Sequence, residues 1–184
     1  SIVLPDSLTS MGEWCFAYCE NLSDVTIGSG LTTISPNAFY GCYALEDVDI
    51  PENVTVIDYA FKNTGLKNVV LHDKITSIEG AFSRTQLTSI PEIPKSITSI
   101  DSTFSGCSGI TVADIPNHIV SINDAFSYCD NLKEANIPNS VVYMDYAFSS
   151  CRKLTDITIP DSVVSIGGAF SECSGLTEVE VPDS

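Results

Sequence analysis

The sequence predicts a solenoid of about eight stacked repeats, with a parallel β-sheet along one face of the coil. The eight phenylalanines of the 184-residue chain recur every 21 to 23 residues. An apolar residue, usually leucine, follows each of them by five or six positions, and a short stretch LxxVxI comes next, usually closed by proline. Because one such unit cannot bury its apolar face alone, successive units must stack on one another. The phenylalanines are Phe16, Phe39, Phe61, Phe82, Phe104, Phe126, Phe148 and Phe170.

Each repeat begins with the LxxVxI stretch, in which apolar and polar residues alternate, as in Leu154, Ile157 and Ile159. This alternation is typical of a short strand with one buried face, so we expect one strand per repeat, stacked in parallel. The proline that follows has no N–H for the ladder and ends the strand. A second apolar pair comes next, as in Val163 and Ile166, and then the string AFxxC, for which we expect a tight helical turn.

One repeat departs from this pattern. The stretch from Leu87 to Ile93 holds one residue more than its counterparts, and Pro91 and Pro94 lie close together in it. We therefore expect a strand bulge or a break in the sheet there. Such irregularity favours a natural array over a designed one.

A period of 20 to 29 residues with this apolar spacing is typical of leucine-rich repeats. We therefore assign residues 1–184 to a single leucine-rich-repeat array. The chain opens on SIVLPDS and closes on EVEVPDS, at nearly the same phase of the repeat, so we expect it to be an excerpt of a longer array. Neither terminus carries a polar capping repeat, which predicts end-to-end self-association.

The charge excludes two classes of partner. Asp and Glu number 24 against 8 Lys and Arg, a net charge of -16, so nucleic acid and anionic membrane surfaces would be repelled. No apolar run reaches the roughly 20 residues of a membrane helix, so we expect no membrane insertion in this segment. A basic protein segment or a divalent cation is compatible with the charge. The alternative is that the acidity serves solubility.

The seven cysteines follow the repeat. Six of them stand three residues after a phenylalanine, where Thr64 and Thr85 replace cysteine in two repeats. We expect a ladder of small, reduced, buried side chains whose thiols donate weak hydrogen bonds to backbone carbonyls. Thiols in a single row, without paired CxxC spacing, do not predict a zinc site. The odd count and inward packing do not favour disulfides.

Nothing in the sequence predicts catalysis or a cofactor. The two histidines, His72 and His118, lie in different repeats without a metalloprotease motif, a nucleophile elbow or a phosphate loop. We interpret both as ordinary surface residues and expect neither a catalytic residue nor a metal ligand. The chain is therefore expected not to be an enzyme.

The strings IPNSVVYMDYAFSSCRKL and IPDSVVSIGGAFSECSGL resemble the BspA-like, or Treponema-type, leucine-rich repeat, and the resemblance covers the whole chain. It implies a right-handed curved coil with the parallel sheet on its concave face and short strands and turns on the convex side. It also implies a cell-surface or secreted protein that adheres to host matrix proteins or to other microbes. Several repeats are one residue shorter than the common family form, as in SIGGAF against TISPNAF.

The outward positions of the strands are the usual recognition surface of such a sheet. They hold eight carboxylates and neither Lys nor Arg. We expect this acidic band to bind a protein partner with a basic segment, such as a host matrix protein or another cell-surface protein. The alternative is a passive structural spacer or scaffold within a larger surface protein. The predicted binding residues are Asp24, Asp47, Asp49, Asp114, Glu134, Asp156, Glu178 and Glu180.

Overall fold

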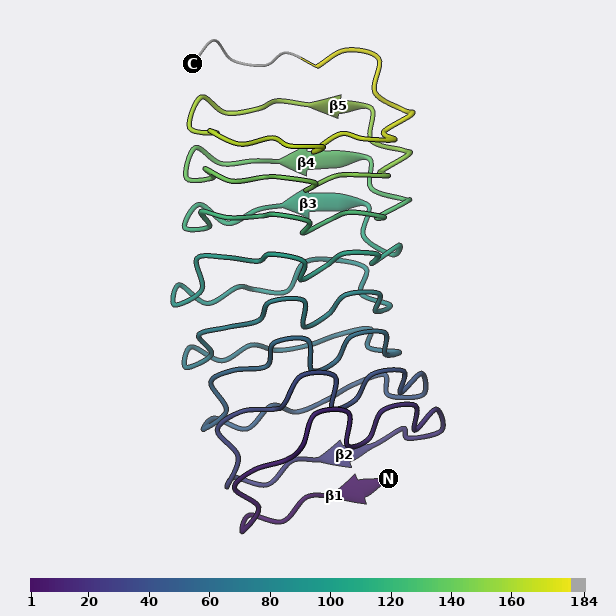
Figure 1. Ribbon diagram of the computed structural model, residues 1–184, viewed down its shortest axis with the longest axis vertical. Coiled ribbons are helices and arrows are strands. Elements are labelled where there is room, and N and C mark those ends of the chain that lie inside the picture. The colour runs from purple at the N-terminus through teal and green to yellow at the C-terminus, as the bar shows by residue number, and fades with distance from the viewer. Residues whose placement is uncertain (180–184) are drawn as a thin grey trace.

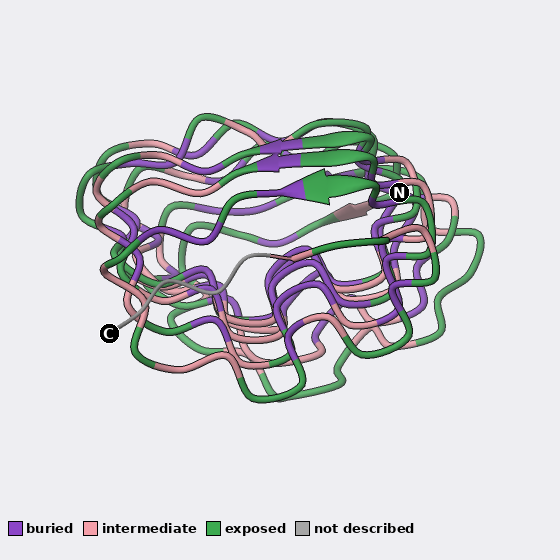
Figure 2. Cartoon of the chain, turned by 90° about the horizontal axis from the view of Figure 1, so that it is seen from above, coloured by how far each residue is buried: buried purple, intermediate pink, exposed green. Residues whose placement is uncertain are grey.

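The computed structural model describes residues 1–179 and confirms the predicted leucine-rich-repeat fold. The chain winds into coils stacked along one axis, with the N-terminus and the C-terminal part at opposite ends (Figure 1). Viewed along that axis, the strands lie on one long side of a flattened coil, and the chain returns along the other side (Figure 2). The apolar side chains of both sides meet inside each coil and form one continuous core along the stack.

Five short strands form two parallel sheets. The first contains β1 (Ile2–Val3) and β2 (Val25–Thr26), with Ile2 paired to Val25. The second contains β3 (Val112–Asp114), β4 (Glu134–Asn136) and β5 (Asp156–Ile157), in that order. Its register places residues 22 positions apart side by side, which is the length of one repeat.

The prediction of one strand in every repeat is wrong for the three repeats between β2 and β3. Their inward residues are still buried, but none of the three stretches forms a strand. In the first, the N–H of Val48 donates to the carboxylate of its neighbour Asp47 at 3.0 Å, and this local bond competes with a ladder bond. In the third, the stretch with the additional residue and two prolines breaks the sheet, as the sequence predicts.

The phenylalanines stack into one column through the whole coil. Centroids of neighbouring rings lie 5.5 to 6.4 Å apart, and the ring planes differ by 2 to 22°. This is the range of offset-stacked aromatic pairs. The six inner rings are fully buried, whereas Phe16 and Phe170 at the two ends are only partly buried.

The segment around each phenylalanine is a run of consecutive turns, and the predicted helical turn is wrong. The residues two before and two after every phenylalanine have positive φ, which includes twelve residues other than glycine. Between Phe39 and Cys42, for example, the N–H of Cys42 donates to the carbonyl of Phe39, and Gly41 has φ 72°, as a type II turn requires at its third position. A helix cannot form because a residue with positive φ interrupts the segment on each side of the phenylalanine.

These turns are held to one another by backbone hydrogen bonds between repeats. Asp124, Phe126 and Tyr128 each donate an N–H to the next repeat, at 2.8, 2.9 and 2.7 Å. The left-handed residues thereby aim their N–H groups along the stack instead of back into their own turn. Short and long repeats close the same turn, since Ala169 donates to Ile166 as Ala38 donates to Ser35. The missing residue therefore leaves the ladder intact.

A row of carboxylate and amide side chains three positions before phenylalanine adds a second ladder. One oxygen of Asp101 accepts from the hydroxyl of Ser121 at 2.7 Å and from the N–H of Asn123 at 2.8 Å. Asp145 accepts in the same way from Ser165 at 2.6 Å and from the N–H of Gly167. Part of the acidity of the chain is therefore structural, because these carboxylates tie one repeat to the next.

Large side chains in the left-handed columns lie over the following repeat. A Cβ added at Gly80 would meet the ring of Tyr59 at 2.2 Å, and one added at Gly168 would meet Tyr146 at 2.4 Å. Every glycine with positive φ in residues 1–179 lies beneath a large side chain of the preceding repeat in this way, the side chain being a tyrosine in three cases and Arg84 in the fourth. Glycine is needed there for space as well as for backbone conformation.

The cysteine ladder is confirmed for five of the seven thiols. Cys42, Cys107, Cys129, Cys151 and Cys173 are buried, and each donates its thiol to the phenylalanine carbonyl of the preceding repeat at 3.0 to 3.3 Å. The predicted burial is wrong for Cys15 and Cys19, which are exposed, although both are free as expected. Both lie in the first coil, where no preceding repeat of the 184-residue chain covers them.

Replacing Phe126 with alanine should destabilise the fold by about 3 to 5 kcal/mol, the usual effect of emptying an aromatic core site. Phe126 is fully buried between Phe104 and Phe148, at 5.8 and 5.7 Å. Phe170→Ala is the matched control and should have a smaller effect, because this ring has one neighbour and is partly exposed. Denaturant unfolding measures both, and equal losses would contradict the buried column.

Gly80→Ala should destabilise the chain by about 1 to 3 kcal/mol, because the new methyl group would overlap the ring of Tyr59. Combining it with Tyr59→Ala should cost less than the sum of the two single changes. The control is Ser102→Ala, which places alanine at the equivalent left-handed position of the next repeat. The residue at that position one repeat earlier is Gly80, which has no side chain for the new methyl group to overlap. Additive losses in the double variant would contradict the packing of tyrosine over glycine.

Stability should fall as the pH rises above about 9. Burial raises the pKa of Cys42 to about 11 and that of Cys151 to about 12, from an ordinary value of 9.0. At a pH between the ordinary pKa of cysteine and the raised pKa of a buried thiol, the unfolded chain releases a thiol proton that the folded chain retains. The free energy of unfolding therefore decreases as the pH rises through this interval. Cys151→Ala should flatten the profile measured by denaturant unfolding from pH 7 to 11, and Thr64→Ala, at a buried position of the same column without an ionisable thiol, should not.

Candidate functional site

The candidate site is the sheet face, which we define as the outward side chains of the LxxVxI segments. Backbone alternation produces it, since the last two apolar residues of a regular segment are buried and the residue between them points outward, as Asp49 does between Val48 and Ile50. Seven of the eight predicted binding residues are exposed on this face, and the eighth, Glu180, lies outside the described residues. The exposed ones are Asp24, Asp47, Asp49, Asp114, Glu134, Asp156 and Glu178.

The sheet brings some of these carboxylates into direct register. Glu134 of β4 lies beside Asp156 of β5, in the column that Val112 occupies in β3. Two others are engaged by neighbours: Asp47 accepts from the N–H of Val48, and Asp114 accepts from the side-chain amide of Asn136. The acidic band is therefore a row of exposed carboxylates, two of which already accept hydrogen bonds within the chain.

Basic residues flank the sheet face one position away. The ammonium of Lys67 lies 2.7 Å from the carboxylate of Glu46, outside the band. Lys133 lines the same shallow hollow over β4 and β5 as Glu134 and Asp156. The sequence places no Lys or Arg at the outward positions themselves, so these two lysines temper the negative field at its margin.

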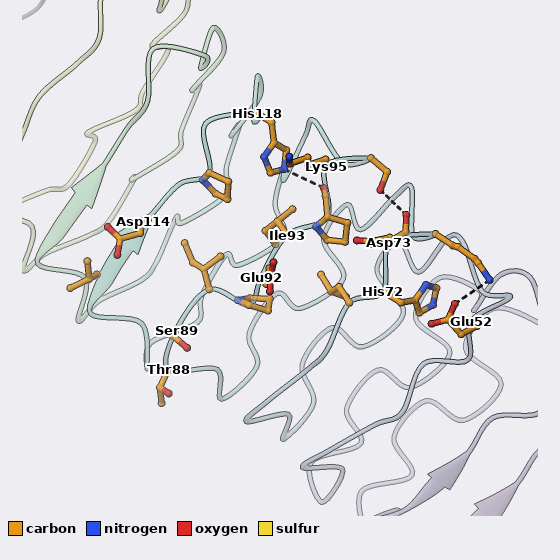
Figure 3. Close-up of a pocket in the computed structure, with 18 of the residues that line it drawn as sticks. Glu52, His72, Asp73, Thr88, Ser89, Glu92, Ile93, Lys95, Asp114 and His118 are labelled. Carbon is orange, nitrogen blue, oxygen red and sulfur yellow. Dashed lines mark hydrogen bonds and ion pairs between the residues drawn. The ribbon is translucent and has the colours of Figure 1, made fainter.

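A cleft of about 1450 Å³ interrupts the sheet face where the strands break. One wall is β3, through Val112 and Asp114, and the other is the irregular stretch from Thr88 to Pro94. Figure 3 shows Glu92 and Ile93 in the middle of the lining, with Asp114 toward one end of the cleft and His72 and Glu52 toward the other. The sequence predicts the break, but the cleft itself depends on how far apart the walls are held.

Both histidines line this cleft, so their interpretation as ordinary surface residues is wrong. His72 and His118 are half-buried. Nε2 of His72 lies 3.0 Å from the carbonyl of Pro51, and Nε2 of His118 lies 3.2 Å from the carbonyl of Pro94, the second of which Figure 3 shows. A carbonyl only accepts, so Nε2 carries the proton in both rings. Each histidine thus ties its repeat to the preceding one. The signal for His72 is its place one repeat length, 21 residues, after Pro51, in the same column. His118 lies 24 residues after Pro94 and has no such signal.

The described residues include no group of three or more His, Cys, Asp or Glu side chains arranged to hold a metal ion. In the same part of the chain, no helix has the length and apolar character needed to cross a membrane. The polar side chains exposed on the sheet face are mainly carboxylates, hydroxyls and amides.

Comparison with known proteins agrees with this architecture, which defines the chain as a leucine-rich-repeat solenoid. The family model of the BspA type leucine-rich repeat region matches in six copies, over residues 1–111 and 101–184. The chain therefore belongs to the BspA-type leucine-rich repeat family, as its repeat strings indicate. None of the curated proteins matches it.

Solved structures share the fold. A leucine-rich repeat protein from Bacteroides ovatus is 26% identical with a TM-score of 0.82, over 96% of this chain and 54% of that one. A leucine-rich cell surface protein from Faecalibacterium prausnitzii is 21% identical with a TM-score of 0.56, over 94% and 69% of the two chains. A leucine-rich repeat protein of T. pallidum is 24% identical with a TM-score of 0.53, over 84% and 64%. The chain spans about half the length of the Bacteroides ovatus protein.

Proposed function

We propose that this chain is a recognition and adhesion module of a cell-surface or secreted protein and binds a protein partner through its sheet face. The observation that carries the proposal is the row of exposed carboxylates at outward positions, with no basic residue among them. The partner would present a Lys/Arg-rich segment, as matrix proteins and other surface proteins can. The module binds and has no catalytic role.

The physical basis is long-range attraction between a fixed band of like charge and a basic segment. Asp24, Asp49 and Glu178 are exposed and form no side-chain hydrogen bond or ion pair within residues 1–179, so their charges are available to a partner. Such a field speeds encounter, and salt suppresses it because the Debye length is about 8 Å at physiological ionic strength. Binding should therefore weaken as the salt concentration rises.

The second candidate is a passive spacer that holds another domain away from the cell. The regular column of stacked rings favours it, because this column would provide a stiff rod whatever the sheet face does. In that case the carboxylates would serve only solvation, and changing them would leave adhesion unaffected. The two candidates therefore differ in a measurable way.

Replacing three sheet-face carboxylates with lysine in one variant should abolish adhesion to surfaces coated with matrix proteins that carry Lys/Arg-rich segments. The three residues are Asp47, Asp49 and Asp156. All three are exposed on the sheet face, so the fold should survive. The matched control replaces Glu13, Glu20 and Asp161 with lysine. These three are exposed outside the sheet face, and the control changes the net charge by the same amount. The adhesion of each variant is measured at low and at high salt and compared with that of the unmodified chain. Circular dichroism verifies that each variant folds.

Loss in the sheet-face variant, retention in the control and weakening by salt would support recognition through the sheet face. Equal loss in both variants would mean that net charge alone acts. Retention in the sheet-face variant would leave the spacer as the better account.

A further inference from the structure

The cleft in the sheet face has a free strand edge along one wall. β3 pairs with β4 on one side and is the outermost strand of its sheet. On that paired side, the carbonyl of Thr111 accepts from Lys133 at 2.9 Å, and the N–H of Ile115 donates to Asn136 at 3.2 Å. Alternate residues of a strand direct their backbone groups to opposite edges. The N–H and C=O groups of Val112 and Asp114 therefore face the cleft.

The opposite wall leaves this edge uncovered. The stretch from Thr88 to Ser96 forms no strand, and none of its N–H groups donates to a backbone carbonyl within residues 1–179. Pro91 and Pro94 have no N–H to offer. With its additional residue this stretch cannot keep the register of the neighbouring repeats, so the coil closes around the core without closing the sheet.

The cleft has the size, floor and charge for an extended polypeptide. Its volume of about 1450 Å³ exceeds the roughly 300 to 1,000 Å³ of sites for small ligands. Leu71, Ile90 and Ile93 contribute apolar surface to its lining. The charged lining residues are four carboxylates and two ammonium groups, and Lys74 is already paired with Glu52 at 3.1 Å. Asp73, Glu92 and Asp114 have no such ion pair within the described residues, which favours a basic occupant.

We propose that an extended segment of a partner protein, with basic and apolar residues in alternation, adds to the free edge of β3 as a further strand. Its backbone pairs with the N–H and C=O groups of Val112 and Asp114. Its apolar side chains face the lining residues Ile90 and Ile93, and its basic side chains face Glu92 and Asp114. This deepens the proposed function by naming the form of the partner segment. Its affinity depends mainly on backbone groups of β3, although Asp114 of the sheet face also takes part.

The first test compares two substitutions of one residue. The probe is the peptide acetyl-KVKVKVK-amide, and its affinity for the chain is measured by calorimetry. Val112→Pro removes the N–H that faces the cleft and no bond to β4, and proline is tolerated at a free edge. It should weaken binding about tenfold or more. Val112→Ala keeps the N–H and should retain affinity within about threefold. Equal affinity of the two variants would overturn the proposal.

The second test uses the unmodified chain, so it does not depend on the folding of a variant. One probe peptide is N-methylated at its valines and another at its lysines, which blocks the N–H groups of one peptide edge in each case. At least one of the two should bind about tenfold more weakly than the parent peptide. Full affinity of both would show that side chains alone bind and would overturn strand addition.

The two proposals fail separately. Loss of adhesion in the sheet-face variant together with an unaffected peptide affinity in Val112→Pro would support the acidic band and overturn strand addition. Loss of peptide binding in Val112→Pro together with retained adhesion in the sheet-face variant would support strand addition and overturn the acidic band. An acidic peptide, acetyl-EVEVEVE-amide, should not bind, and equal binding of it would overturn the basic character of the occupant.

Discussion

The structure depends on one constraint: no repeat can complete its own core or its own hydrogen bonds. A phenylalanine ring is covered by the rings above and below it, 5.5 to 6.4 Å away, and its N–H donates to the next repeat. The thiol three residues further on donates back to the preceding repeat. Each unit is therefore stable only when its neighbours are present, as in other quasi-one-dimensional arrays.

This constraint governs which residues the turn side accepts. Side chains of the left-handed columns extend over the following repeat, and Tyr59 and Tyr146 each lie over a glycine, at a position that leaves no room for a Cβ. The column three residues after phenylalanine accepts only small side chains that can donate to a carbonyl. Thr64 meets that requirement with its hydroxyl, which donates to Phe61 of its own repeat at 2.8 Å, in place of the thiol bond to the preceding repeat.

The two sides of the coil contribute differently to stability and function. The turn side continues through all eight phenylalanines, whereas the sheet is interrupted across three repeats without disturbing the buried column. The sheet side therefore tolerates a local break, such as the one that Pro91 and Pro94 introduce. The open cleft and the free edge of β3 follow from that tolerance, and exposed carboxylates such as Glu92 and Asp114 line the cleft.

The sequence by itself determined the repeat length, the buried columns, the outward positions of Asp49 and Asp156 and the break near Pro91, because each is a periodic property of the chain or a departure from its period. Only the tertiary structure decided which thiols are covered, which repeats lack strands and where the cleft opens. Cys19 is exposed and Cys42 buried although they share one column, because a neighbouring repeat covers one and not the other. His72 and Asp114 line one cleft from separate repeats for the same reason: distances between residues 20 or more positions apart depend on how successive coils pack.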